Sequence, residues 1–295
     1  IMVYGIDNLL LRYQYSIDGW AREIEVSFPV NNANKLTRVA GNLMSILTFL
    51  TGDHWNVSFN SHIPTTFFKK RKTIRSSPSI FDKHNLASAS LFSGGLDSLV
   101  GIIDALKSLN PKKSLLLVSH YDSISSGANA DQVRLEKHLS KHFSQNINWV
   151  QSCVALSRKD NTGRRLHCEP SMRSRSLLFI SMGVYALSAL PNNQELLIPE
   201  NGTISLNFPL TPSRSSTLST RTTHPYFLDS LQNLLTKLGI NTKLKNPYWN
   251  KTKGELLKGC SEKKALHLTY KDSVSCGKRG RRGHWDKRSG TNHCG

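Results

Sequence analysis

Acidic residues are scarce in this sequence. Its 295 residues include 20 Asp and Glu against 39 Lys and Arg, which gives a formal net charge of +19. A chain this basic favours anionic partners such as nucleotides, RNA, DNA or an acidic protein, and the charge says nothing about the fold. The length allows two domains or one large domain with a sizeable core.

Long hydrophobic runs are also missing. The most apolar window, 176–190, is shorter than the ~18–20 residues of a membrane span, so we interpret it as a buried helix and expect no membrane partner. The first residues lack the basic start and cleavage site of a secretory signal. Five cysteines at irregular positions then predict free thiols or a metal site in a reducing cytoplasm, without a disulfide framework.

The sequence begins with a small α+β extension, residues 1–66, of the order strand, strand, helix, strand. Its expected strands cover 9–17, 22–30 and 54–62, and its expected helix covers 34–52. Such a unit either folds as a separate domain or flanks the next sheet. Residues 67–85 are basic and contain Ser and Pro, which is typical of a linker.

Residues 86–250 predict an α/β domain. Short continuous apolar segments alternate with amphipathic ones, the pattern of a doubly wound parallel sheet covered by helices on both faces. The expected strands are 87–93, 113–122, 146–156 and 194–202, and the expected helices are 97–109, 129–143 and 173–190. Residues 251–295 form a basic C-terminal segment, and the glycines and arginines of its last part predict no packed helix or strand.

The stretch SGGLDS, residues 93–98, lies where the first strand of this domain meets its helix. Ligands of open parallel sheets bind at this edge, and Gly94 and Gly95 let the backbone turn sharply there. Free N–H groups of the loop, together with the Ser93 and Ser98 hydroxyls, predict an anion cradle. It is neither a Walker A loop, since no lysine follows the glycines, nor a GxGxxG loop.

Asp97 adds a carboxylate to this expected cradle. A carboxylate beside a phosphate is repulsive unless a cation intervenes, so we expect Asp97 to be exposed at the start of the helix and to hold Mg²⁺. The alternative is an ordinary glycine turn in which Asp97 caps the helix.

The stretch LFSGGLDSLVG resembles the SGGxDS phosphate loop of the N-type ATP pyrophosphatases, the PP-loop superfamily. The resemblance implies an adenine nucleotide alpha hydrolase-like fold and an enzyme that cleaves ATP between its α- and β-phosphates and passes AMP to a substrate oxygen. It implies nucleotide contacts from Phe92, Ser93, Gly94, Gly95, Leu96, Asp97 and Ser98, with ATP and Mg²⁺ as cofactors.

Further stretches resemble the 7-cyano-7-deazaguanine synthases, which are ligases of this superfamily. In SMRSRSLLFISMGVYAL, Arg175 matches the arginine of the family's PGRN segment, while Arg173 and Ser174 replace its PG. The stretch KNPYWNKTKGELL is similar to the family's TPL…KAE segment. The resemblance implies that Arg175 and Arg173 neutralise the departing pyrophosphate. It also implies that Glu200 and Asn201 contact a guanine-like substrate, although a polar turn explains Glu200 and Asn201 equally well.

The N-terminal extension and the loop Thr223 to Pro225 resemble the branch found in bacterial anti-phage gene clusters, the QatC type. This implies a 7-carboxy-7-deazaguanine-like acid as substrate, and ammonia or the N-terminus of a partner protein as the attacking amine. Two alternatives stay open: a tRNA-modifying pyrophosphatase, favoured by the net charge, and a non-catalytic nucleotide- or RNA-binding module. The oligomeric state is also open, a homodimer included.

Cys276 and Cys294 resemble the start of the zinc site of the same synthases. A structural Zn²⁺ ion takes four ligands, usually cysteine or histidine. We therefore expect that the sequence ends inside the metal site, or that His284 or His293 completes it. Two unrelated thiols in a basic tail are the other interpretation.

Overall fold

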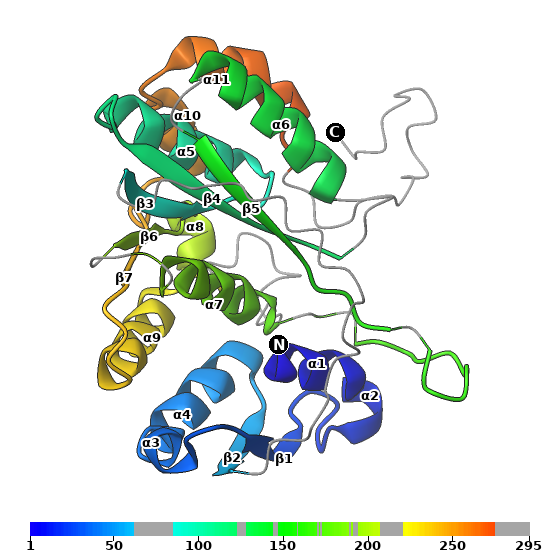
Figure 1. Ribbon diagram of the computed structural model, residues 1–295. Helices are drawn as coiled ribbons and strands as arrows, with labels where there is room; N and C mark the ends of the chain where they lie inside the picture. Colours follow the sequence, from blue (N-terminus) through cyan, green and yellow to red (C-terminus); the bar gives the residue numbers. More distant parts are fainter. Residues whose placement is uncertain are drawn as a thin grey trace.

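The computed structural model describes most of the chain and shows two sheets with helices around them (Figure 1). The described residues are 1–61, 85–122, 128–143, 147–157, 159–169, 171, 173–188, 190, 194–206 and 221–274. No helix among these residues combines the length and the apolar character needed to cross a membrane.

The larger sheet has five strands, all parallel, in the order β5-β4-β3-β6-β7. They are β3 (Leu86–Leu91), β4 (Ser114–Tyr121), β5 (Ile147–Cys153), β6 (Glu195–Leu197) and β7 (Lys243–Lys245). The chain moves outward from β3 to β5 on one side and then from β6 to β7 on the other. The strand order therefore reverses between β3 and β6, and ligands of doubly wound sheets bind at such a switch point.

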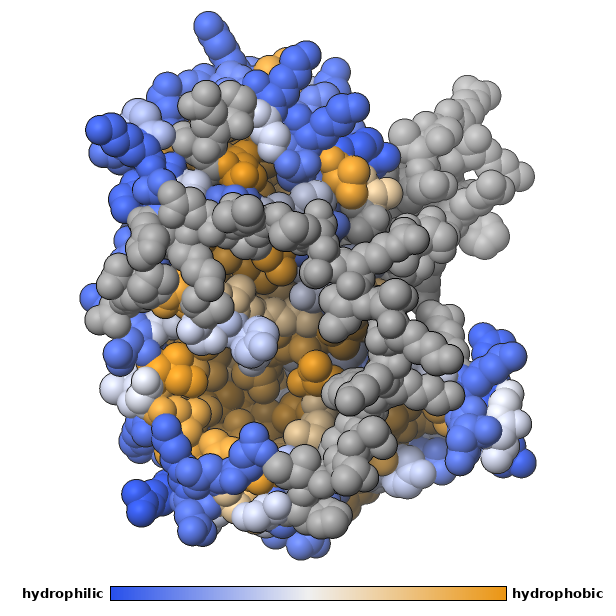
Figure 2. All heavy atoms as spheres, viewed as in Figure 1, coloured by the Kyte–Doolittle hydropathy of each residue, from blue (hydrophilic) through white to orange (hydrophobic). Residues whose placement is uncertain are grey.

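Helices cover both faces of this sheet, which confirms the predicted α/β architecture (Figure 1). One face carries α5 (Leu96–Ser108), α6 (Ala128–His142), α10 (Lys253–Lys258) and α11 (Lys263–Thr269), and the other carries α7 (Arg175–Ser188) and α9 (Pro225–Lys237). The short helices α8 (Gly202–Ser205) and η2 (Tyr270–Asp272) complete this part. In the space-filling view, apolar side chains show in a hollow in the middle of the face, at the level of α7 (Figure 2).

The predicted helix at 173–190 forms as α7, with one side buried. Ile180, Val184 and Leu187 face the core, while Tyr185 is 80 % exposed. Helices α10 and α11 follow residue 251, where the sequence analysis assigned no helix. A capping box of Thr252 and Glu255 begins α10, and both helices bury apolar residues against α5 and α6.

The N-terminal part begins with helices where a strand was expected. Its elements are α1 (Met2–Leu9), α2 (Arg12–Tyr15), β1 (Glu23–Pro29), α3 (Ala33–Thr37), α4 (Ala40–Thr51) and β2 (His54–Asn60). The prediction of a strand at 9–17 is wrong because Tyr13, Tyr15 and Ile17 point to solvent and no neighbouring sheet covers them. Strands β1 and β2 pair in parallel. Helix α4 shares a core with α7 and α9, so this part flanks the large sheet.

Buried charges hold the N-terminal part together. The Arg22 guanidinium is fully buried and lies 2.6 Å from both Asp7 and Asp53, and Arg12 lies 2.6 Å from Asp53. The Arg12 backbone N–H donates to Glu169, in the segment that leads into α7. Such a network is costly to break, since removal of one member leaves a buried charge without its partner.

Candidate functional site

The predicted glycine loop connects β3 to α5. The Phe92 N–H donates to the Val118 carbonyl and extends the sheet by one residue, while the Phe92 ring is buried in the core. Gly94 has a φ of +84°, a conformation that side chains disfavour, whereas Gly95 has a φ of −84° and is the N-cap of α5. The buried Gln132 amide of α6 donates to the Phe92 and Ser93 carbonyls, which lead into the turn, and holds this side of it in place.

The two serine hydroxyls are bonded within the loop. Ser93 Oγ accepts from the Gly95 N–H and donates to Ser98 Oγ at 3.1 Å, and Ser98 Oγ donates to the Gly95 carbonyl at 2.8 Å. The hydroxyls therefore shape the cradle, and either must rotate before it can donate to a ligand. The N–H groups of the first turn of α5 have no carbonyl four residues earlier within the helix, so they point out of its N-terminus.

Asp97 is buried, which corrects the expectation that it is exposed. Its side chain lies under the loop, and Asn201 donates to its Oδ2 from the backbone N–H and, at 2.6 Å, from Nδ2. Its buried Oδ1 forms an ion pair with Lys253 Nζ at 3.4 Å and accepts no hydrogen bond from a described residue. A metal ion at this oxygen would take the place of the lysine ammonium.

Glu200 lies beside Asp97 at the carboxyl end of β6. Burial and the Asp97 charge raise the pKa of Glu200 to about 8, and Lys253 opposes the shift. At neutral pH Glu200 is therefore mostly protonated. Carboxylate oxygens are the ligands that Mg²⁺ prefers, and a divalent ion would replace that proton. Asn201 is bound to Asp97 and caps α8, so it positions the acid more than it offers a substrate contact.

Close backbone packing brings Glu200 to Asp97. A Cβ on Gly101, one turn after Asp97, would lie 2.3 Å from Cγ of Pro199. A Cβ on Gly202 would lie 2.4 Å from the Trp249 carbonyl oxygen. Because neither glycine has a side chain, the segment 199–202 can lie directly against α5 on one side and against the loop before α10 on the other.

A cavity of about 110 Å³ opens between the ends of β3 and β6. It is lined by Leu91, Ser93, Ser98, Ser176, Phe179, Ile180, Ile198, Pro199, Glu200, Thr222 and Thr223. The Ser176 and Thr223 hydroxyl oxygens are buried with no hydrogen-bond partner in the part of the chain that the structure describes. Buried polar atoms are normally paired. These two hydroxyls are therefore available to a polar ligand in the cavity, which Asp97 does not line.

The structure separates the two predicted arginines. Arg173 donates to the Thr51 carbonyl at 2.7 Å and stacks over Trp20 at 4.0 Å, and burial lowers its pKa to about 10. It contacts the N-terminal part, so the geometry gives it a structural role there. Arg175 is exposed at the first residue of α7, directly before the cavity residue Ser176.

Four residues of this region were not predicted as site residues from the sequence: Lys253, Gln132, Thr223 and His120. Lys253 and Thr223 lie in stretches that carry the family resemblance, so their positions held a signal. His120 is buried at the end of β4, where its Nε2 lies 3.1 Å from the Val154 carbonyl oxygen and burial lowers its pKa. The sequence signal that could have identified His120 as a site residue is its position at the carboxyl end of a predicted strand.

The predicted zinc ligands Cys276 and Cys294 lie outside the described residues, as does 67–84 of the expected linker. Among the described residues, no group of three or more His, Cys, Asp or Glu side chains is arranged to hold a metal ion. The other cysteines, Cys153, Cys168 and Cys260, are free thiols, and Cys153 is exposed.

The fold and this site define an α/β protein of the doubly wound class, with a glycine loop and an acid pair at its switch point. No family model and no curated protein sequence matches the chain. One solved structure is similar: the U34-tRNA thiolase NcsA from Methanococcus maripaludis with its [4Fe-4S] cluster, at 15 % identity and a TM-score of 0.37. The match covers 65 % of this chain and 61 % of that one, and similarity at this level carries no argument.

Proposed function

We propose that this protein is an ATP pyrophosphatase of the PP-loop type, which binds MgATP at the glycine loop and transfers AMP to an acceptor oxygen. The observation that carries the proposal is the buried Asp97 carboxylate, which lies beside Glu200 at the switch point with Lys253 Nζ 3.4 Å away. The SGGLDS motif of the same loop supports it.

The chain's own residues account for the binding that this reaction needs. The first-turn N–H groups of α5 would hold phosphate oxygens, and Asp97 and Glu200 would hold the Mg²⁺ ion. The ion would neutralise charge on the phosphates. Lys253 and Arg175 add positive charge for the departing pyrophosphate. Because the acceptor oxygen attacks the α-phosphate directly, no protein nucleophile is required.

For the acceptor, the sequence resemblance favours a 7-carboxy-7-deazaguanine-like carboxylate. Its oxygen would form a bond to the α-phosphorus as pyrophosphate leaves, and an amine would then displace AMP from the acyl-adenylate. The amine is ammonia or the N-terminus of a partner protein. The unpaired Ser176 and Thr223 hydroxyls, which line the cavity beside the loop, supply polar groups for such a substrate.

A tRNA-modifying pyrophosphatase is the second candidate, and the net charge of +19 favours it. The ATP site is the same in both cases, and only the acceptor differs. A non-catalytic nucleotide- or RNA-binding module is the third reading, which the acid pair in the site argues against.

The test measures pyrophosphate and phosphate released from MgATP in the presence of the deazaguanine acid or of tRNA. We expect pyrophosphate with one acceptor, and on the order of 100-fold less with Asp97→Asn. Glu25→Gln, an exposed change on β1, is the matched control and keeps the wild-type rate. Full activity of Asp97→Asn, or no pyrophosphate with either acceptor, contradicts the proposal.

A further inference from the structure

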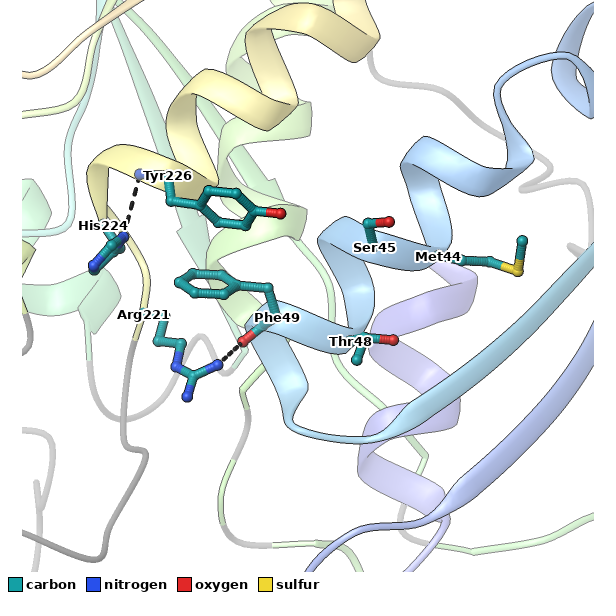
Figure 3. Close-up of a pocket in the computed structure, with 7 residues that line it drawn as sticks. All are labelled: Met44, Ser45, Thr48, Phe49, Arg221, His224 and Tyr226. Carbon is teal, nitrogen blue, oxygen red and sulfur yellow. Dashed lines mark hydrogen bonds between the residues drawn. The ribbon is translucent and has the colours of Figure 1, made fainter.

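A second concave surface lies away from the glycine loop. It is an open groove of about 810 Å³ between the last turns of α4 and the start of α9 (Figure 3). Met44 and Phe49 of α4 line one side, and Arg221, His224 and Tyr226 line the other. The two helices run antiparallel here, since Lys237 at the end of α9 bonds Asn42 at the start of α4.

Three rings and a guanidinium meet in this groove (Figure 3). The Phe49 ring centroid lies 4.7 Å from that of Tyr226 and 5.2 Å from that of His224, at tilts of 59° and 58°. Arg221 lies over Phe49 at 4.6 Å and donates to its carbonyl at 2.7 Å. Phe49 is thereby fixed, while the Tyr226 ring remains 51 % exposed.

The groove carries positive charge and hydrogen-bond donors. Helix α4 contains no charged residue, and Arg221 is the cation among the residues that line the groove. His224 Nδ1 accepts from the Tyr226 N–H, and burial and Arg221 lower its pKa, so its other nitrogen carries the ring proton. The acid on α9 is Asp229, which is exposed one turn after Tyr226.

One segment separates this groove from the cavity at the switch point. Arg221 and His224 line the groove, and Thr222 and Thr223 between them line the cavity. A molecule held in the groove therefore lies next to the proposed acceptor site.

We propose that the groove binds single-stranded nucleic acid, with a base stacked on Tyr226 and a phosphate on Arg221. An exposed ring beside a cation is the arrangement by which proteins bind unpaired strands without sequence preference. The net charge of +19 complements a phosphate backbone. This binding goes beyond the proposed function, since it needs neither ATP nor the acid pair.

The test is fluorescence anisotropy of a labelled single-stranded RNA of about 12 nucleotides with the full chain and no ATP. Tyr226→Ala should raise Kd about tenfold, and Tyr226→Phe, which keeps the ring, should restore binding. Arg221→Gln should weaken binding and lower the slope of log Kd against log salt by about 0.7. Asp229→Asn should tighten it.

Tyr185→Ala and Lys112→Gln are matched controls, because each removes an exposed ring or cation elsewhere. Tyr226→Ala with wild-type affinity, equal losses in the controls, or no RNA binding by the wild type overturns the proposal. An acidic peptide that binds equally well and loses affinity in Tyr226→Ala would also overturn it. Asp97→Asn should bind RNA with wild-type affinity. Loss of pyrophosphatase activity and loss of RNA binding in the groove can therefore be told apart.

Discussion

The Glu200 carboxyl lies beside the charge of Asp97. Burial and that charge raise the pKa of Glu200 to about 8 without a metal ion, and Lys253 opposes the shift only in part. The sequence motif predicted Asp97 as a metal ligand but not its burial. That burial depends on Asn201 and Lys253, which are more than 100 positions further along the chain and reach Asp97 only through the fold.

Glu200 should make stability depend on pH. Between its ordinary pKa of 4.5 and about 8, the folded protein binds more protons than the unfolded chain, so stability falls as pH rises through this window. Glu200→Gln should remove a loss of folding stability on the order of 4 kcal/mol between pH 5 and 8.5, measured by urea unfolding without nucleotide. Glu195→Gln, a change at the start of β6, should keep the wild-type dependence of stability on pH. An unchanged dependence in Glu200→Gln contradicts the carboxyl pair.

At the scale of elements, apolar patterning predicted β3, β4, β5 and α7 well, because their burial is continuous or periodic. It failed at 9–17, where alternating tyrosines are exposed on a helix. The pattern could not show which helix packs closely on which loop. Gly101 illustrates this, since nothing in the local sequence says that Pro199 lies against it.

Gly101→Ala should displace the segment that carries Glu200. Its Cβ would lie 2.3 Å from Pro199 Cγ, and overpacking of this kind costs about 1–3 kcal/mol. Gly254→Ala in α10 is the matched control, since its Cβ would meet nothing within 4 Å, and alanine there should be neutral or stabilising. Thermal unfolding and ATP turnover of both variants measure the difference. Equal stability in the two would show that Pro199 moves freely.

At the scale of the molecule, the N-terminal part is joined to the large sheet by charge and by packing. The Ser174 backbone N–H donates to Asp7, and the Arg12 backbone N–H donates to Glu169. Helix α4 packs on α9. The sequence left open whether this part is separate, because buried ion pairs between distant segments have no periodic signature.

Asp53→Ala should destabilise the whole protein by about 3–5 kcal/mol, since it leaves the buried Arg12 and Arg22 with Asp7 as their remaining acid among the described residues. Urea unfolding followed by tryptophan fluorescence measures this. Asp229→Ala, an exposed change, should have a far smaller effect. A loss confined to the N-terminal part, with the large sheet still folded, would contradict the coupling between them.

The Val274 backbone N–H donates to the Gly94 carbonyl at 2.9 Å, so the glycine loop touches a segment that is translated long after it. Lys253, beside Asp97, is also encoded far downstream. A ribosome must therefore translate as far as Val274 before these contacts of the loop can form. Nascent chains that stop before α10 contain the SGGLDS motif but lack these contacts, so translation itself delays the assembly of the loop.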